Sequence, residues 1–263
     1  QKMSNINNYE RELRRNVGKE SIEAFARLYF PHYLTNKTCP FHRELYEILF
    51  DITNKRGEQV AIAAPRGSAK SSIATLIYLI WAICYKKEEY ILLISNTSDL
   101  AITLLSHIKN ELETSERLIE DFPEICETGQ KPGPERWRKD EIVTRNGVKI
   151  TALGAEQKVR GRRNNEFRPS LIILDDVEGE ANTQSADSRE KLEDWFTKAV
   201  LNAGDRKTNI VVIGTILHTD SLLAKRTNWL SGWRKKIYKS VIKWAIHQEM
   251  WDEWSNILNY RNS

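Results

Sequence analysis

The sequence predicts an α/β protein whose mainly parallel sheet is flanked by helices. Short apolar runs without polar–apolar alternation recur along the chain, and segments with helical spacing separate them. Such runs are typical of parallel strands that are buried on both faces. A chain of 263 residues is long enough for one sizeable core with a small accessory part. In sheets of this kind, ligands bind at the carboxyl ends of the strands.

The expected elements follow one another in the order that this fold class requires. The strands are apolar runs at 58–64, 90–95, 170–176 and 209–215. The helices have apolar residues at helical spacing or are apolar throughout, at 22–30, 39–55, 70–85, 97–118 and 185–203. A Thr-Ser-Asp cluster favours a helix start at 97–99. The pair Asn146-Gly147 predicts a hairpin with a type I′ turn over 141–153.

The chain is expected to have three parts, which are an N-terminal helical segment (1–57), a core (58–232) and a short linker segment (233–263). Its most apolar run, at 71–85, follows the first strand directly. This run is shorter than the ~20 residues that a membrane-spanning helix needs. It is therefore expected to be buried in the core, and no membrane partner is predicted.

The composition is that of a globular protein from a reducing compartment. Hydrophobic residues make up 40% and charged residues 29% of the chain. Cys39, Cys84 and Cys126 are odd in number, far apart and without a C-x-x-C neighbour, which favours reduced thiols over disulfides or a zinc site. The first fifteen residues lack the apolar region of a secretory signal. A net charge of +4 permits a polyanionic partner without requiring one.

The stretch AIAAPRGSAKSS joins the first expected strand to the most apolar helix. In the pattern G-x-x-x-x-G-K-[ST], backbone N–H groups surround phosphates, while the lysine and the hydroxyl serve phosphate and Mg²⁺. We align the stretch with this pattern on Lys70 and Ser71. The alignment places Ala64 and Ala69 at the two glycine positions, with Gly67 between them. The stretch is therefore either a degenerate phosphate loop or a simple turn between a strand and a helix.

A second stretch, LIILDDVE, places acidic residues at the end of a strand. Four apolar residues followed by Asp175 resemble a Walker B strand, whose carboxylate orders Mg²⁺ through its water shell. Asp176 or Glu178 could polarise a water for in-line attack on a γ-phosphate. The alternative is an acidic turn after a buried strand. Together the two stretches favour nucleotide binding, because the carboxyl ends of parallel strands meet at one edge of a sheet.

Two more stretches add polar groups to this region. The fourth strand ends in GTILH, which contains Gly214, Thr215 and His218. These residues could sense the γ-phosphate, or they could form a simple turn with a surface histidine. The stretch QKVRGRRNNEFR carries five basic residues, which are Lys158, Arg160, Arg162, Arg163 and Arg168. They could stabilise a transferring phosphoryl group, contact DNA phosphates or form a solvated basic loop. The basic segments 131–139 and 233–243 are weaker evidence of the same kind.

The order of these motifs resembles the N-terminal ATPase domain of the large terminase subunit of tailed bacteriophages, the motor that packages DNA into a procapsid. The resemblance spans most of the chain and includes FHRELYEIL, APRGSAKSS, ISNTSDLA, ITALGAEQKVRGRR, LIILDDVE, LEDWF and VVIGTILH. That family tolerates a degenerate phosphate loop bearing an arginine, provided that backbone amides and the helix N-terminus still face the phosphates. The resemblance implies a P-loop NTPase fold, with ATP and Mg²⁺ as cofactors.

By resemblance, the matching positions take part in ATP hydrolysis. Lys70 contacts the β- and γ-phosphates, and Arg66 reaches the γ-phosphate. Ser71 and Asp175 coordinate Mg²⁺. Glu178 is the expected catalytic carboxylate and Asp176 the runner-up, because this glutamate commonly follows the Walker B aspartate directly, whereas here it comes three places later. The remaining nucleotide-binding positions lie in the loop or the preceding helix, and they are Pro65, Gly67, Ser68, Ala69, Ser72 and, bordering the adenine, Phe41 and His42.

The resemblance also assigns roles beyond the phosphate loop. Gly214, Thr215 and His218 resemble the motif that couples hydrolysis to movement. Arg160, with Gly161 beside it, is expected to act in trans as an arginine finger in a neighbouring subunit. Arg162 and Arg163 are the next choices for this finger.

The implied partners are those of a packaging motor. They are double-stranded DNA, further copies of the chain in a homo-oligomeric ring, the portal protein and the small terminase subunit, in the host cytoplasm at the procapsid portal. Nuclease activity is not expected, because the last segment offers no strand-borne acidic cluster. Two alternatives remain open, a helicase-like translocase and a nucleotide-gated DNA-binding module that does not hydrolyse ATP.

Overall fold

The computed structural model describes residues 2–34, 37–126, 137–228, 232–241 and 246–261. Their strands form one sheet in the order β3-β4-β2-β5-β6-β1-β7. The strands are β1 (Gln59–Ala63), β2 (Tyr90–Ser95), β3 (Glu141–Val143), β4 (Lys149–Gly154), β5 (Leu171–Asp175), β6 (Asn209–Gly214) and β7 (Arg234–Ile237). The pair β3–β4 is antiparallel and the other pairs are parallel. The predicted fold class, a mainly parallel sheet flanked by helices, is confirmed.

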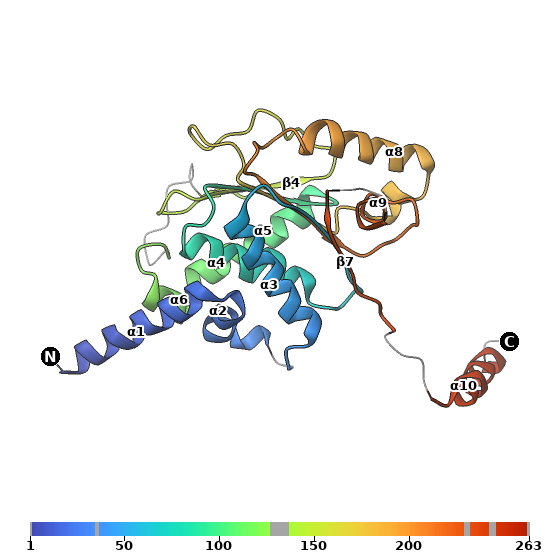
Figure 1. Cartoon of the computed structure of the whole chain (residues 1–263), viewed down its shortest axis with the longest axis horizontal. Coiled ribbons are helices and arrows are strands. Elements are labelled where there is room, and N and C mark those ends of the chain that lie inside the picture. The colour runs from blue at the N-terminus through green and yellow to red at the C-terminus, as the bar shows by residue number, and fades with distance from the viewer. Residues whose placement is uncertain (1, 35–36, 127–136, 229–231, 242–245, 262–263) are drawn as a thin grey trace.

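Helices cover both faces of this sheet. Figure 1 shows α3, α4 and α5 on one side and α8 and α9 on the other. Their bounds are α1 (Lys2–Glu20), α2 (Ile22–Tyr29), α3 (Pro40–Lys55), α4 (Tyr78–Cys84), α5 (Ser98–Thr114), α6 (Glu116–Asp121), α7 (Glu180–Thr183), α8 (Ala186–Trp195), α9 (Leu222–Asn228) and α10 (Gln248–Arg261). None of the described helices combines the length and the hydrophobicity that a membrane crossing requires.

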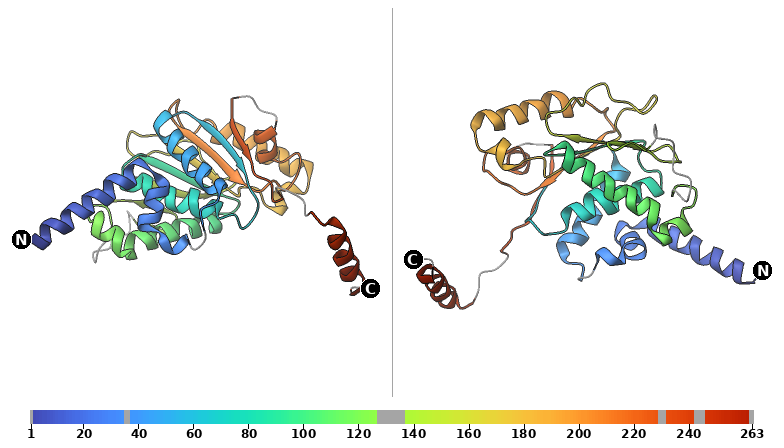
Figure 2. Two further views of the ribbon diagram at one scale, coloured as in Figure 1. Left: turned by 60° about the horizontal axis from the view of Figure 1, so that its bottom comes forward. Right: turned by 180° about the vertical axis from the view of Figure 1, so that it is seen from behind.

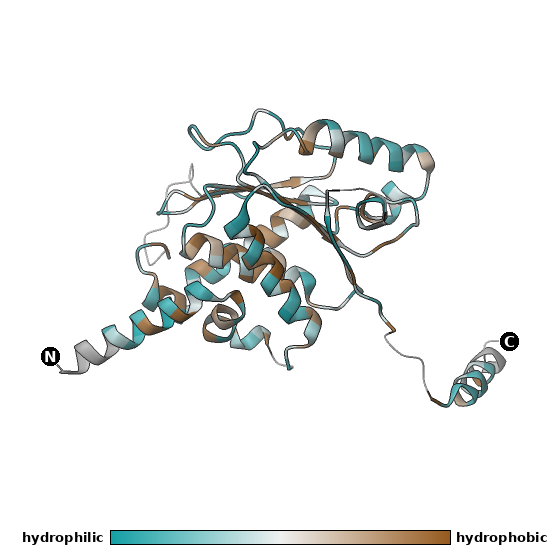
Figure 3. Ribbon diagram, in the orientation of Figure 1, coloured by the Kyte–Doolittle hydropathy of each residue, from teal (hydrophilic) through white to brown (hydrophobic). Residues whose placement is uncertain are grey.

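Consecutive residues of the central strands face two different cores. In β2, Ile91 and Leu93 belong to the cluster under α2 to α5, whereas Leu92 and Ile94 belong to the cluster under α8 and α9. Hydropathy colouring shows apolar residues on α3, α4 and α5 and a mostly hydrophilic α8 (Figure 3). Burial on both faces explains why the strands read as unbroken apolar runs rather than as alternating patterns.

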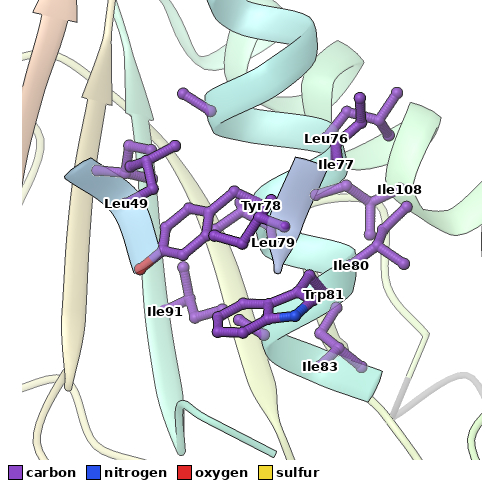
Figure 4. Packing of buried hydrophobic residues seen from close by; sticks show 14 of the residues in the cluster. Leu49, Leu76, Ile77, Tyr78, Leu79, Ile80, Trp81, Ile83, Ile91 and Ile108 are labelled. Atoms are coloured by element: carbon purple, nitrogen blue, oxygen red, sulfur yellow. The ribbon is translucent and has the colours of Figure 1, made fainter. Parts of the chain in front are cut away.

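The helix that follows β1 is buried on nearly all sides, as its composition predicts. It begins at Lys70, passes through a π-type segment (Ser72–Ile77) and continues as α4. Tyr78 and Trp81 are fully buried in the cluster that Figure 4 shows. Trp81 Nε1 donates to the carbonyl oxygen of Gly18 at 3.0 Å. Close packing of this helix fixes the position of its first residue, Lys70, relative to the sheet.

Two local predictions are wrong in detail. The predicted helix over 97–118 is two helices, α5 and α6, because Ser115 takes an extended conformation with ψ of 104°. The predicted hairpin forms, with Ile142 opposite Ile150. Its turn is not type I′, because Gly147 has a φ of +85° while Asn146 is not in the left-handed region. The Thr144 N–H instead donates to the carbonyl oxygen of Val148, which closes a longer loop.

Helix α1 lies within the N-terminal segment 1–57 that was expected to be helical, although no helix of its own was predicted there, and strand β7 was not expected. The mostly polar α1 docks on α6 through Arg14, whose guanidinium donates to both carboxylate oxygens of the fully buried Asp121 at 2.5 and 2.8 Å. Strand β7 lies inside the segment 233–263 that was predicted as a linker, and it extends the sheet beyond β1. Lys236 of β7 pairs with Glu44 of α3. In Figures 1 and 2, α10 lies apart from the rest of the described chain.

Candidate functional site

The loop between β1 and the buried helix has the backbone shape of a turn around an anion. Gly67 and Ala69 have φ values of +72° and +59°, and the helix begins at Lys70. The Ala64 N–H donates to the carbonyl oxygen of Gly214 on the neighbouring strand at 2.9 Å. Position 69 therefore requires the left-handed conformation that glycine adopts without strain. This is the position at which the phosphate-binding pattern has its second glycine.

Asp175 ends β5 with a carboxylate that is almost completely buried. The residue is 2% exposed, and its Oδ1 atom has no hydrogen-bond partner among the described residues. Burial raises the pKa of Asp175 to about 6 and the neighbouring Asp176 charge adds to the rise, whereas the nearby Ser71 hydroxyl and the Lys70 charge oppose it. An orphaned carboxylate oxygen beside a serine hydroxyl suits Mg²⁺, which binds one or two protein oxygens and otherwise keeps phosphate and water ligands. The residues present therefore fit the metal.

Lys70 and Asp176 face each other in the site. The Lys70 Nζ atom lies 3.1 Å from Asp176 Oδ2, and the lysine side chain is 6% exposed. Asp176 has a φ of +42°, and its Oδ1 accepts a hydrogen bond from the Thr215 N–H at 3.1 Å. Gly214 permits this contact, since a Cβ atom there would lie 3.1 Å from Asp176 Oδ1. The structure thus joins the end of β5, the end of β6 and the start of the buried helix.

Glu178 is engaged differently from Asp176. It is buried, and its Oε1 and Oε2 atoms accept hydrogen bonds from the N–H groups of Leu222 at 2.6 Å and Leu223 at 2.9 Å. Burial raises the pKa of Glu178, and these two backbone hydrogen bonds partly oppose the shift. Both carboxylate oxygens therefore hold the first turn of α9.

Lys70, Asp176, Glu178 and Thr215 line one pocket of about 470 Å³ at the carboxyl ends of β1, β2, β5 and β6, whereas the buried Asp175 is not among its lining residues. Its lining comprises Arg66, Gly67, Ser68, Ala69, Lys70, Ser71, Ser72, Asn96, Leu100, Asp176, Glu178, Thr215 and Leu217. Most of the residues that the sequence singled out for phosphate and catalysis thus meet in one place. Pro65 belongs to the loop but does not line this pocket.

A second, more apolar pocket of about 320 Å³ shares Gly67, Ser68, Ala69 and Ser72 with the first one. Phe41 and His42 line it, together with Tyr33, Leu34 and Cys39. His42 Nε2 lies 2.9 Å from the carbonyl oxygen of Ser68, so α3 contacts the loop directly. The two predicted base-contacting residues therefore lie beside the loop, in a cavity with an aromatic wall.

Other predicted residues lie outside both pockets. Arg160 and Arg163 are exposed, and Arg162 donates from Nε to the carbonyl oxygen of Lys158 at 2.9 Å. His218 accepts the Asp220 N–H on its Nδ1 atom in the turn before α9. Of the weaker basic segments, residues 131–136 and 242–243 lie outside the described part of the chain.

Asn96 and Asn182 are site residues to which the sequence analysis assigned no role. Asn96 follows β2 and lines the first pocket, and its Oδ1 accepts a hydrogen bond from Asn182 Nδ2 at 2.9 Å. A polar residue directly after a buried parallel strand is the signal that could have identified Asn96. The contact with Asn182 depends on tertiary structure and has no sequence signal.

Comparison with known proteins gives a likeness to a solved structure. No protein-family model matches the chain, and no curated protein matches it. The ATPase domain of the large terminase of Thermus phage P74-26, in an arginine-to-alanine mutant, aligns with a TM-score of 0.46 and 13% identity. The alignment covers 82% of this chain and 91% of that one. We therefore base the function on the geometry of the site.

Proposed function

We propose that this chain is a Mg²⁺-dependent ATPase that drives the movement of double-stranded DNA as one subunit of a ring. One observation carries the ATPase part of the proposal. A loop with left-handed residues, followed by a lysine and a serine at a helix start, lies beside the buried carboxylate of Asp175, which has one oxygen without a partner among the described residues. Such a set suits a phosphate chain with a bound divalent ion and has little use in an ordinary turn.

The two pockets suit the two ends of a nucleotide. Phosphates would lie in the first pocket, where Arg66 and Lys70 supply positive charge and the loop supplies backbone N–H groups. The base would lie in the second pocket against Phe41 and His42. Because Gly67, Ser68 and Ala69 line both pockets, the ribose would cross the loop. We assign ATP rather than another nucleotide from the resemblance of the sequence motifs alone.

Ser71 and Asp175 would hold Mg²⁺, with Asp175 contributing the oxygen that has no partner among the described residues. The ion, when bound, supplies charge neutralisation at the phosphates. Because the raised pKa of Asp175 reflects an unfavourable buried charge, a cation beside it would stabilise the ionised form.

Asp176 is our choice for the residue that orients the attacking water, in place of the Glu178 that the sequence favoured. Both oxygens of Glu178 hold backbone N–H groups of α9. Among the described residues, Asp176 Oδ2 is paired only with Lys70, whose side chain would turn to the phosphates when they bind. In the reaction, the water oxygen bonds to the γ-phosphorus while the bond to the β,γ-bridging oxygen breaks. ADP leaves with that oxygen, and the water proton passes to the carboxylate and then to phosphate.

Coupling to movement would run through β6 and α9. Thr215 joins Asp176 to the loop, because its N–H donates to Asp176 and its hydroxyl donates to the carbonyl oxygen of Ala64 at 3.1 Å. Glu178 ties the same region to α9, which packs on β1 and β7. Release of the γ-phosphate would therefore be transmitted through α9 to β1 and β7, at one edge of the sheet. DNA, ring, portal and small-subunit partners, and the location at the procapsid portal, are proposed from the sequence resemblance alone.

Phosphate release by the purified chain with Mg²⁺ and ATP tests this proposal. We expect slow hydrolysis that double-stranded DNA stimulates. Stimulation by single-stranded DNA together with strand separation would favour a helicase-like translocase. Tight ATP binding without any phosphate release, with or without DNA, would favour a nucleotide-gated binding module.

A further inference from the structure

Asn96 directly follows β2 and lines the first pocket. It follows Ser95, which pairs with Asp175 across β2 and β5. Asn96 therefore lies beside the turn that carries Asp176 and Glu178, and it lines the same pocket as Lys70. This part of the pocket wall therefore also bears the carboxylates of Asp176 and Glu178.

A chain of hydrogen bonds fixes which end of the Asn96 amide is a donor. The Gly179 N–H donates to Asn182 Oδ1 at 2.7 Å, so Asn182 must present its amino group to Asn96. That amino group donates to Asn96 Oδ1 at 2.9 Å. The Asn96 oxygen is thus occupied, and the Nδ2 atom keeps two N–H donors. Within the described ranges, no acceptor is bound to Nδ2.

Gly179 leaves the room that this amide needs. A Cβ atom at position 179 would lie 2.3 Å from Asn96 Nδ2, closer than any real contact. A side chain at this position would have to displace the Asn96 amide. The Asn96 amide is therefore held in two ways. Its oxygen accepts a hydrogen bond from Asn182, and its nitrogen lies against Gly179, where a Cβ atom would displace it.

We propose that Asn96 Nδ2 donates a hydrogen bond to the terminal phosphate of a bound nucleoside triphosphate and so distinguishes it from a diphosphate. The inference rests on the proposed function, because it requires a nucleotide in this pocket. A neutral amide suits the role, since it attracts a phosphate oxygen on a wall whose other polar groups, Asp176 and Glu178, repel it. Its link to Asn182 and Gly179 connects this contact to the turn after β5.

The test compares the affinities of a non-hydrolysable ATP analogue and of ADP, both with Mg²⁺, by isothermal titration calorimetry. For Asn96→Asp we expect the analogue to bind about 10–100-fold more weakly, because a carboxylate would replace a donor to a charged acceptor. ADP affinity should change by less than about twofold, because ADP lacks the contacted phosphate. Asn96→Ala should show a smaller loss of the same selectivity.

Two further variants separate this contact from a merely structural role. Gly179→Ala displaces the amide without changing it, so it should also weaken the analogue selectively. Asn182→Ala removes the orienting hydrogen bond from outside the pocket lining and should reduce the selectivity less than Asn96→Asp does. If Asn96 only supports the fold, all these variants lose both ligands in parallel and melt at lower temperature, which overturns the inference. If the parent binds both nucleotides and Asn96→Asp keeps the ratio of their affinities, the inference about Asn96 is wrong while the proposed function stands. If the parent binds neither nucleotide, both the inference and the proposed function are wrong.

Discussion

Lys70 and Asp176 form an ion pair across the candidate site, with 3.1 Å between Nζ and Oδ2. The lysine is almost fully buried, so its ammonium needs a partner of opposite charge. Asp176 provides one from the neighbouring element and also accepts the Thr215 N–H. A phosphate that pairs with Lys70 in place of Asp176 would free the Oδ2 atom of Asp176 without moving the backbone. This exchange links phosphate binding to the freeing of a carboxylate in the same pocket.

Lys70→Ala should lower ATP turnover by at least about 10²-fold and weaken nucleotide binding, because it removes a positioned charge at the phosphates. Phosphate release and calorimetric titration measure the two effects. Lys55→Ala is the matched control, since Lys55 also forms a 3.1 Å ion pair, with Asp51, but is exposed and lies outside both pockets. Parental turnover in the Lys70 variant would show that the loop does not bind phosphate.

Asp176→Asn should bind Mg²⁺ and ATP yet hydrolyse almost nothing, because it loses the carboxylate that orients the water. Glu178→Gln should instead lose about 1–3 kcal/mol of stability, because the side-chain NH₂ of the glutamine would face a backbone N–H of α9, and two donors cannot form a hydrogen bond. Urea unfolding and phosphate release are measured on both variants. Should Glu178→Gln bind without turnover while Asp176→Asn stays active, the assignment favoured by the sequence is correct.

Asp175→Asn should stabilise the nucleotide-free protein at pH 7.5 by about 1–3 kcal/mol, because a pKa raised to about 6 reports a charge that folding disfavours. The folded protein binds this proton more tightly than the unfolded chain does. The stability that Asp175 contributes is therefore full below its unfolded pKa and is lost as the pH rises through about 6. The difference between variant and parent should vanish near pH 4 in urea unfolding series.

The same substitution should remove the metal dependence of nucleotide binding. In the parent, protons compete with Mg²⁺ for Asp175, so the effect of Mg²⁺ on affinity should weaken as the pH falls from 7 to 5. In Asp175→Asn, Mg²⁺ should have little effect at any pH in this range. A variant that keeps the full Mg²⁺ effect would place the metal elsewhere.

The strands and the loop were predictable because their signals are local. A strand buried on both faces must be apolar throughout, and Lys70-Ser71 at a helix start can be read from a short window. Strand β7 escaped detection because Arg234, Lys235 and Lys236 give an edge strand a basic sequence. The hydrogen bonds of Glu178 to α9 join residues 44 and 45 positions apart, so no local pattern contains them. The acid that the sequence favoured as catalytic is therefore the one whose two oxygens both accept backbone N–H groups.

Ala69→Gly should be tolerated and should change stability by up to about 1 kcal/mol in the stabilising direction. Relief of left-handed strain, about 1–2 kcal/mol, outweighs the entropy of the added glycine, about 0.5–1 kcal/mol. Ala64→Gly is the matched control, because Ala64 is buried and is not in the left-handed region. It should be destabilising in the same urea series. Equal effects at the two positions would contradict the strain at Ala69.

Arg160 is predicted to complete the active site of a neighbouring subunit. It is exposed, lies outside the pocket lining and precedes Gly161, whose φ of +80° turns the backbone sharply. Arg162 is less suited, since its guanidinium is tied to the carbonyl oxygen of Lys158. A finger of this kind is worth about 10³–10⁵ in turnover in other nucleotide hydrolases, so the isolated monomer should be a weak ATPase.

Mixing two inactive variants decides the role of Arg160. Arg160→Ala keeps an intact phosphate loop and Lys70→Ala keeps an intact finger, so under assembling conditions the mixture should partly recover hydrolysis. Arg160→Ala mixed with the double variant lacking both groups should recover none, because neither partner then supplies a finger. If Arg160 instead contacts DNA, its loss leaves basal hydrolysis intact and lowers the salt slope of DNA binding by about 1. Absence of rescue, where parent subunits do assemble and hydrolyse, would therefore rule out the finger and leave the DNA contact to be measured.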